Sequence, residues 1–287
     1  MFPKKNQNCH LEIGHLIEWA TLSLATNSSS PRLDAEVLMA EITHYPRSTV
    51  MAFPERMLSQ SVGESFQALV ELRGKGVSIA HLTGHKEFYS LDLKVSSNTL
   101  VPRPETEMLV DEVLSQTDPL QTASILDLGT GCGAIALAIK KQRPNCRVVA
   151  VDLSLEALRI AAENGCLLGL EIEWLCSRWL TSLDNYSFDF IVSNPPYVER
   201  GDVHLLSQEL SYEPSLALDG GLDGLDSIRE IIASIPNVLA TGGMFFLEHG
   251  HQQALDVSKL LQEAGFSGVK TKNDLAGCDR MTLGKWL

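Results

Sequence analysis

A strand-like run that ends in a glycine-rich turn is the first segment whose residue types could do chemistry. The segment ILDLGTGCGAIALAI, residues 125–139, is typical of a buried strand, a tight turn and the start of a helix. Gly129 and Gly131 tolerate backbone angles that other residues resist, and without side chains they let a ligand approach the main chain. The segment therefore predicts a binding site for a nucleotide-like ligand.

The spacing of this loop fits two kinds of ligand. Gly129, Gly131 and Ala134 match the G-x-G-x-x-A pattern of dinucleotide-binding proteins. Gly129, Gly131 and Gly133 equally match the G-x-G-x-G loop that S-adenosylmethionine enzymes use. The loop alone leaves both ligands open, together with a purely structural turn.

Two aspartates narrow the choice. Asp152 ends the next predicted strand, 23 residues after Gly129, where a carboxylate can accept hydrogen bonds from ribose hydroxyls. Asp127 lies just before the loop, at the strand end where open α/β sheets bind ligands. A carboxylate there suits a cationic amino group, such as that of the methionine part of S-adenosylmethionine, and would repel a pyrophosphate. The two aspartates therefore favour S-adenosylmethionine over NAD.

The tetrad Asn194-Pro195-Pro196-Tyr197 follows the strand-like run DFIVS, so we expect it at the same edge of the sheet. Proline fixes its own φ, lacks an N–H and holds the preceding residue extended. The Pro195 carbonyl and the Asn194 side-chain oxygen are then two rigid acceptors, which suit a planar NH₂ group. The alternative is a rigid corner between strand and loop with no chemical role.

Holding a planar NH₂ group in this way could activate it. Amide resonance, which underlies a rotation barrier of ~18–20 kcal/mol, ties up the nitrogen lone pair. Acceptors that turn the lone pair toward an electrophile would help, since good positioning contributes roughly 7–11 kcal/mol. Tyr197 could stack on the planar group or face a sulfonium. Because an N-alkylated amide is strongly acidic, no dedicated base is required.

Alternating strand and helix patterns must position these residues. The strand-like runs are SILDL, CRVVAV, IEWL, DFIVS and GMFFLEH. The helical patterns between them are EMLVDEVLSQ, AIALAIKKQ, LEALRIAAENG, LDSIREIIASIPNVL and QALDVSKLLQEAG. This alternation is typical of βαβ units, so we expect an α/β domain with a mostly parallel, doubly wound sheet.

The first third of the chain has a different pattern. Helical spacing over residues 10–76 predicts a small helical bundle, with Ser30 as the N-cap and Pro31 as the first position of one helix. Residues 81–103 alternate approximately between apolar and polar, which predicts a short hairpin. We therefore expect a helical domain over 1–80, a hairpin linker over 81–104 and the α/β domain over 105–287.

Composition limits the partners and the compartment. A net charge of −13, with 23 Lys and Arg against 36 Asp and Glu, disfavours DNA as the main substrate and suits a basic partner protein. Six scattered cysteines without a CxxC pair indicate neither a zinc site nor a disulfide framework, so we expect no metal and a reducing cytoplasm. Neither a membrane-spanning apolar run of ~20 residues nor a signal peptide is indicated.

Taken together, these motifs resemble the class I S-adenosylmethionine-dependent methyltransferases of amino groups, which carry [DNS]PP[YFW]. More closely, the chain resembles the HemK/PrmC family, the peptide chain release factor glutamine N5-methyltransferases. The resemblance covers nearly the whole chain and rests on SPRLDAEVLMA, HLTGHKEFYSLDLKVSSNTLVPRPETE, DLGTGCGAIALA, NPPYV, YEPSLALDGGLDGL and FLEHG.

This resemblance implies a fold and a reaction. The fold would be a helical domain that recognises the release factor, a hairpin linker and a Rossmann-like catalytic domain with a seven-stranded sheet. The reaction would methylate the side-chain amide of the glutamine in the factor's Gly-Gly-Gln tip, and would release S-adenosylhomocysteine. No direct contact with nucleic acid is expected, and the enzyme would be a monomer.

The resemblance also implies site residues. Together with Asp127, the residues that contact the cofactor would be Gly129, Thr130, Gly131, Cys132, Gly133, Asp152, Trp179 and Asn194. The glutamine amide would be held by Asn194, Pro195, Pro196 and Tyr197, of which Asn194, Pro195 and Tyr197 would be catalytic. The chain departs from the family at Ser177-Arg178-Trp179, because the family usually has an acidic or small residue and then Asp before the tryptophan. Whether Arg178 perturbs the electrostatics of the adenine site is left open by the sequence. Trp179 could instead be a core tryptophan.

Other residues keep two interpretations. Arg103 could pair with the methionine carboxylate, or with Glu105 or Glu107. The polar loop 213–221 could cover the site as a lid or be an ordinary surface loop. Cys132 is expected to fill space, because no histidine base is placed beside it.

Three alternative functions remain at this stage. A sister enzyme could modify a glutamine of a ribosomal protein, and a DNA enzyme could methylate the exocyclic amine of adenine. The tetrad does not separate them, because both targets are planar NH₂ groups, but the acidic charge argues against DNA. A non-catalytic binding module is disfavoured by the intact glycine loop, Asp152 and the tetrad.

Overall fold

A computed structural model describes residues 11–184, 186–202 and 210–287 of the chain. Contacts between residues divide it into two compact units, Met1–Gly84 and His85–Leu287. The predicted hairpin is present and belongs to the second unit: strands β1 (His85–Phe88) and β2 (Leu91–Lys94) pair antiparallel. Within the described residues, no helix is both long and apolar enough to cross a bilayer.

The first unit is helical, as its spacing predicts. Its described helices are α1 (Ile13–Leu24), α2 (Pro31–Thr43), α3 (Arg47–Ala52), α4 (Gln60–Gly74) and α5 (Ile79–Thr83). The apolar residues of α1 lie on one face and pack with Leu38 and Met39 of α2 and Phe66 of α4 in one core. The short helices α3 and α5 were not expected, because one or two turns are too short to show a period.

Ser30 occupies the N-cap position of α2 and Pro31 the first helical position, but the Ser30 hydroxyl makes no capping bond. It instead donates to Asp34 Oδ1 at 3.2 Å. Asp34 Oδ2 accepts from Arg73 Nε of α4 at 2.7 Å and from the Ser28 hydroxyl at 2.7 Å. Because the Asp34 carboxylate is buried, charged and hydroxyl groups must replace water as its partners. These bonds connect the start of α2 to α4.

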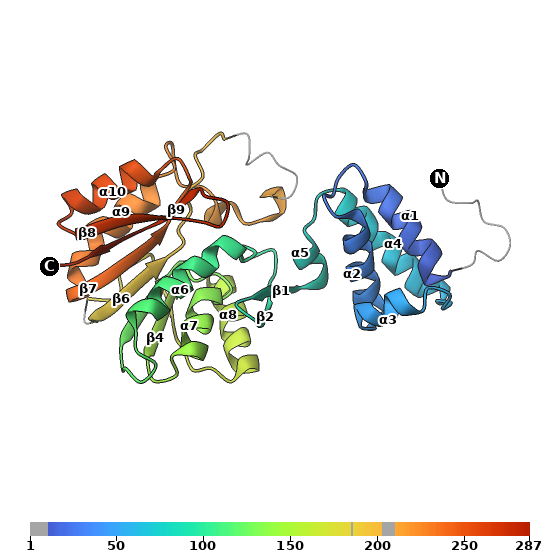
Figure 1. Cartoon of the computed structure of the whole chain (residues 1–287), viewed down its shortest axis with the longest axis horizontal. Helices are drawn as coiled ribbons and strands as arrows, with labels where there is room; N and C mark the ends of the chain where they lie inside the picture. The colour runs from blue at the N-terminus through green and yellow to red at the C-terminus, as the bar shows by residue number, and fades with distance from the viewer. Residues whose placement is uncertain (1–10, 185, 203–209) are drawn as a thin grey trace. The chain divides into compact units, whose positions relative to one another are not determined.

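The second unit is built on a sheet of seven strands within the described residues, and Figure 1 shows its arrangement. Its spatial order is β5-β4-β3-β6-β7-β9-β8. Strands β3 to β7 pair parallel, and β9 is antiparallel to both of its neighbours. Their bounds are β3 Ser124–Leu128, β4 Arg147–Asp152, β5 Glu173–Cys176, β6 Phe188–Ser193, β7 Leu239–Glu248, β8 Ser267–Asn273 and β9 Asp279–Lys285. This is the mostly parallel sheet that the sequence predicts.

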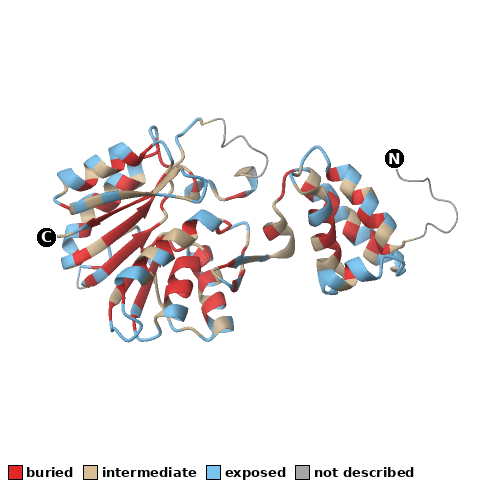
Figure 2. Cartoon of the chain, in the orientation of Figure 1, coloured by how far each residue is buried: buried red, intermediate tan, exposed pale blue. Residues whose placement is uncertain are grey.

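Helices cover both faces of this sheet. Figure 1 shows α6 (Glu107–Gln116), α7 (Ala134–Gln142) and α8 (Leu155–Leu168) on one face, and α9 (Asp226–Ser234) and α10 (Ala254–Glu263) on the other. The core on the second face joins apolar residues of β3, β4, β6 and β7 to those of α9 and α10. Figure 2 shows the central strands buried and the outer helix faces exposed, as expected for strands covered on both faces.

The helix predicted over 225–239 is too long. It ends at Ser234, residues 235–237 form a 3-10 turn, and Leu239 already begins β7. Pro236 explains the difference, because it lacks the N–H that an α-helix needs in its interior. The other predicted helices of this unit match α6 and α7 in full and α8 and α10 to within a few residues.

Arg73 provides a test of the packing in the first unit. We expect Arg73→Met to destabilise that unit by about 3–5 kcal/mol, because it leaves the buried Asp34 charge without its cation. Arg32→Ala is the control: Arg32 is exposed, its partner Glu36 keeps Arg47, and the expected loss is below about 1 kcal/mol. Urea denaturation of the full chain, with hydrogen exchange over residues 11–84, would measure both. Equal losses in the two variants would contradict the structural role of this pair.

Candidate functional site

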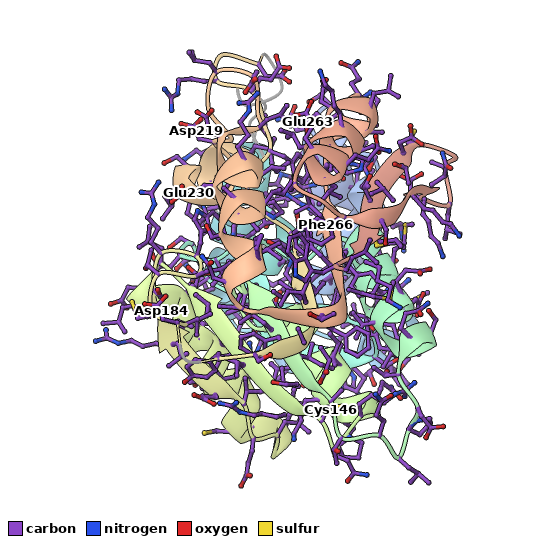
Figure 3. All side chains as sticks on the ribbon, turned by 90° about the vertical axis from the view of Figure 1, so that its left-hand side faces the viewer. Cys146, Asp184, Asp219, Glu230, Glu263 and Phe266 are labelled. Carbon is purple, nitrogen blue, oxygen red and sulfur yellow. The ribbon has the colours of Figure 1, made fainter. Side chains whose placement is uncertain are left out.

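A cavity of about 560 Å³ opens at the carboxyl edge of the sheet in the second unit. Strand order reverses at β3: β4 and β5 lie on one side of it, β6 and β7 on the other, and ligands bind at such switch points. Predicted site residues that line the cavity are Gly129, Gly131, Asp152, Trp179, Asn194 and Pro196. Figure 3 labels two further lining residues, Asp219 and Glu230, on the side of the unit away from Cys146, which precedes β4. The structure therefore brings the glycine loop, the strand-end aspartate and the tetrad to one cavity.

The glycine loop is held in a shape that only glycine adopts without strain. Gly129, Gly131 and Gly133 have φ values of 73°, 57° and 87°. The amides of Gly129 and Thr130 donate to the Val151 carbonyl of β4 at 2.8 and 3.0 Å. A side-chain carbon at Gly131 would meet nothing within 4 Å, so the main chain there faces open space. The loop therefore presents bare backbone to a ligand.

Asp152 braces this loop from the end of β4. Its Oδ2 accepts from the Gly131 amide at 2.8 Å, and its Oδ1 accepts from the Ser154 amide at 2.8 Å. Burial raises the pKa of Asp152, while these amide donors act in the opposite direction. Each carboxylate oxygen has a second lone pair, so the group can still accept hydroxyl donors from a ligand in the cavity.

Asp127 is fully buried at the end of β3 and is only half satisfied. Its Oδ2 accepts from the Thr130 hydroxyl at 2.6 Å and from the Ala136 amide at 3.2 Å. Its Oδ1 is buried and has no hydrogen-bond partner among the described residues. Burial raises the pKa of Asp127 to about 7. A buried carboxyl oxygen without a donor fits a cationic amino group, but Asp127 does not line the cavity and its contact with a donor stays a prediction.

Trp179 has a left-handed backbone, with φ at 47°, and its ring lies over the glycine loop. A side-chain carbon built on Gly129 would lie 3.5 Å from Trp179 Cζ3. Arg178 turns to the rim, where its Nε and Nη2 donate to the two carboxylate oxygens of Glu230 at 2.7 and 2.8 Å. The unusual arginine before the tryptophan is therefore neutralised by an ion pair with α9.

The tetrad divides between the cavity and the core. Asn194 Nδ2 donates to Thr106 Oγ1 at 3.1 Å, and no described residue donates to Asn194 Oδ1. Pro196 lines the cavity, whereas the Tyr197 side chain packs against the core under α9 and α10. Its hydroxyl donates to Glu248 Oε1 at 3.1 Å, and burial raises the pKa of Tyr197. Stacking of Tyr197 on a substrate amide stays a prediction, as does the acceptor role of Pro195.

Three polar residues that hold the site were not singled out for that role in the sequence. Asn164 of α8 donates to the carbonyls of Cys132 and Lys94, which joins the glycine loop to the hairpin. Glu213 accepts from Arg103, so the suggested pairing of Arg103 with Glu105 or Glu107 is wrong. Glu248 is buried beside the tetrad, and the quoted motif FLEHG was the one available signal for it.

Glu213 also accepts from the Val101 amide at 3.2 Å, so the segment before α6 and the loop after the tetrad are joined at a buried carboxylate.

Cys132 is buried, and burial raises the pKa of its thiol to about 12. A thiol that stays protonated is not a nucleophile, which supports its expected role as a space-filler. Gly133 leaves room for Leu137, Trp174 and Ala161, each 3.1–3.2 Å from the position of an added side-chain carbon.

The half-satisfied Asp127 predicts a pH-dependent stability. Its pKa rises from 3.8 to about 7 on folding, so its contribution to stability is full below about pH 4 and is lost as the pH rises through 7. Asp127→Asn cannot ionise, so its melting temperature relative to the natural protein should increase between pH 4 and pH 8. Glu263→Gln, at an exposed site on α10, is the control and should show no such trend. Thermal melts without ligand at both pH values would test this, and a constant difference would contradict it.

Comparison with known proteins agrees with this architecture. A family model described as methyltransferase small domain matches residues 104–215, and one described as PrmC N-terminal domain matches residues 15–84. A methyltransferase structure from Pyrococcus furiosus aligns with a TM-score of 0.53 at 21% identity, over 76% of this chain and 96% of that one. A 16S rRNA N2 G1207 methyltransferase from T. thermophilus, solved with AdoMet and guanosine, aligns with a TM-score of 0.52 at 20% identity, over 71% of this chain and 50% of that one. These two likenesses show the fold.

Curated relatives are much more similar, and each is named release factor glutamine methyltransferase. The relative from Pseudomonas aeruginosa is 45% identical over 91% of this chain and 94% of its own length. Those from Escherichia coli and Shewanella oneidensis are 41% and 39% identical, over 96% and 98% of this chain and 99% and 98% of their own lengths. Because this identity extends through both units, the chain belongs to the family of release factor glutamine methyltransferases that its motifs resemble.

Proposed function

We propose that this protein methylates the side-chain amide nitrogen of the glutamine in the Gly-Gly-Gln tip of peptide chain release factors, with S-adenosylmethionine as the donor. One observation carries the proposal: Asn194 lines the cavity together with the glycine loop, and its NH₂ is bound to Thr106, so its side-chain oxygen has no donor among the described residues. The names of the relatives supply the substrate class.

The donor would be held by residues that fit its three parts. Asp127, with its unpartnered buried oxygen, would take the methionine ammonium, and Asp152 would accept from the ribose hydroxyls. Trp179 would pack on the adenine, since its ring already lies over Gly129. When bound, S-adenosylmethionine supplies an electrophilic methyl group on a sulfonium.

The protein's own residues would then prepare the glutamine amide. The main-chain carbonyl oxygen of Asn194 lies 3.9 Å from the position that a side-chain carbon on Gly129 would occupy. The tetrad and the loop are therefore close neighbours. Asn194 Oδ1 and the Pro195 carbonyl would each accept one N–H of the amide, which would turn the nitrogen lone pair toward the methyl group. The newly methylated amide nitrogen would be positively charged and strongly acidic, so it would release one proton to water without a dedicated base. The other product is S-adenosylhomocysteine.

The partner and compartment follow from the same proposal. An acidic chain, with a net charge of −13, suits a basic protein partner and disfavours direct binding to nucleic acid. We propose that the first unit, residues 11–84, recognises the release factor, since it matches the model described as PrmC N-terminal domain. We also propose that the enzyme acts as a monomer in the cytoplasm, where a translation factor is its substrate.

Methyl transfer from labelled S-adenosylmethionine tests the proposal. The substrates would be purified release factor, its variant with alanine at the tip glutamine, a ribosomal protein fraction and unmethylated DNA. We expect one methyl group on the tip glutamine and none on the variant, as read by mass spectrometry. In the Asn194→Ala enzyme, turnover should fall by on the order of 10²-fold or more, with only a modest loss of donor binding.

Label on DNA or on ribosomal protein alone would mean that the site was correctly assigned and the partner was not. Near-normal turnover of Asn194→Ala would remove the tetrad from the mechanism.

Asp152→Ala should act on the donor instead of on the chemical step. It removes the carboxylate that holds the Gly131 amide and the proposed ribose contacts, so the KM for S-adenosylmethionine should rise by roughly 10–100-fold. Steady-state kinetics at saturating release factor would measure it, with exposed Glu263→Ala as a charge-matched control. An unchanged KM would show that Asp152 does not contact the donor.

A further inference from the structure

The main chain that follows the tetrad is paired with the glycine-rich loop 218–224, LDGGLDG. The Val198 amide donates to the Leu218 carbonyl at 3.0 Å, and the Val198 carbonyl accepts from the Gly220 amide at 2.9 Å. The Arg200 amide donates to the Gly221 carbonyl at 2.7 Å. Part of this loop lines the cavity. The sequence leaves a lid or a surface loop open here, and these bonds hold the loop as a wall of the cavity beside the tetrad.

Gln253, the N-cap residue of α10, holds the last residue of the tetrad. Its Nε2 donates to the Tyr197 carbonyl at 3.0 Å, and its Oε1 accepts from the Gly250 amide at 2.9 Å. A main-chain carbonyl can only accept and a main-chain N–H can only donate, so both partners require the same orientation of the Gln253 amide. Gln253 is buried. The Tyr197 carbonyl is therefore fixed by a buried side chain from another element.

Two glycines of the loop lie so close to the tetrad that a larger residue would displace it. A side-chain carbon on Gly224 would lie 2.4 Å from the Tyr197 carbonyl oxygen and 2.5 Å from Gln253 Nε2. One on Gly220 would lie 2.8 Å from Tyr197 Cα. Gly224 also has a φ of 72°, which other residues adopt only with strain. The loop can therefore pack directly against the main chain of the tetrad because these positions are glycine.

We propose that Gln253, Gly220 and Gly224 are positioning residues that fix the main chain of the tetrad at Tyr197, and so hold its acceptors where the glutamine NH₂ requires them. The two prolines set the internal shape of the tetrad, whereas these three residues set where it lies. A misplacement of about 1 Å can lower a rate by on the order of 10²-fold. The inference rests on the proposed role of the tetrad, and none of the three residues lines the cavity.

Gln253→Met tests the hydrogen bonds, because it keeps the length of the side chain and removes both of them. We expect kcat for release factor to fall by on the order of 10–100-fold, since the Tyr197 carbonyl loses its donor and the tetrad its anchor. The Kd for S-adenosylmethionine should stay within about threefold, because the glycine loop 129–133 is untouched. Gln252→Met is the matched control: it is the same substitution at the adjacent exposed position, and kcat should be unchanged.

Gly224→Ala tests the close approach by an independent change, and it decides the matter should Gln253→Met fail to fold. Its methyl group would meet the Tyr197 carbonyl oxygen, so the tetrad must move and kcat should fall by on the order of 10-fold or more. Gly277→Ala is its control, because Gly277 has a φ of 82° and an added carbon there meets nothing within 4 Å. It carries similar backbone strain without the contact, so kcat should be unchanged.

Calorimetry of donor binding, run on each variant beside the kinetics, separates positioning from general damage. Natural kcat in either folded variant would overturn the inference. A loss of donor binding as large as the loss of kcat would also overturn it, because the whole site and not the tetrad would then have been disturbed.

Asn194→Ala, assayed in parallel, separates this inference from the proposed function. An inactive Asn194→Ala beside fully active Gln253→Met and Gly224→Ala would retain the role of Asn194 and reject the positioning residues. A fully active Asn194→Ala, or a natural protein that transfers no methyl group to release factor, would reject both.

Discussion

The register of the parallel strands is the constraint on which the site depends. Leu128 of β3 pairs with Val151 of β4 and with Ser193 of β6. The next residue along each strand is therefore at the same level: Gly129, Asp152 and Asn194. Two hydrogen bonds close these strand ends, from the Gly129 amide to the Val151 carbonyl at 2.8 Å and from the Ser193 hydroxyl to the Leu128 carbonyl at 2.9 Å. Parallel pairing alone brings the three residues together, and a slip of one residue would separate them.

Buried carboxyl groups are used differently in the two units. In the first unit, Asp34 and Glu36 are paired with arginines and serve to join helices. At the carboxyl edge of the sheet, Asp127 and Glu248 each keep one buried oxygen without a hydrogen bond from the described residues, and burial raises the pKa of both to about 7. Incomplete pairing costs stability, so such groups persist where a ligand or a mechanism uses them. Their placement at the ends of β3 and β7, on either side of the tetrad strand β6, fits that use.

Segments far apart in the sequence enclose the site through a few polar residues. Asn164 joins the hairpin to the glycine loop, and Glu213 joins the segment before α6 to the loop after the tetrad. Both side chains are buried: Asn164 bonds to main-chain groups of both segments, and Glu213 bonds to the Val101 amide and the Arg103 side chain. The cavity walls are therefore set by side chains that do not themselves have to contact a ligand.

Local features of the sequence were enough to predict most of the elements and the class of reaction. Apolar periodicity, the glycines of the loop and the prolines of the tetrad are local features, so the parallel sheet, the N-terminal helices, the hairpin and the family could be predicted from them. The final antiparallel pair β8 and β9 and the short helices α3 and α5 carry weak periods, and only the resemblance implied the two extra strands. The partners of individual polar groups depend on how the whole chain packs: Arg103 pairs with Glu213, Arg178 with Glu230, and Asn194 with Thr106. A hydrogen bond between residues 88 apart depends on how strands and helices pack, and no local pattern records that geometry.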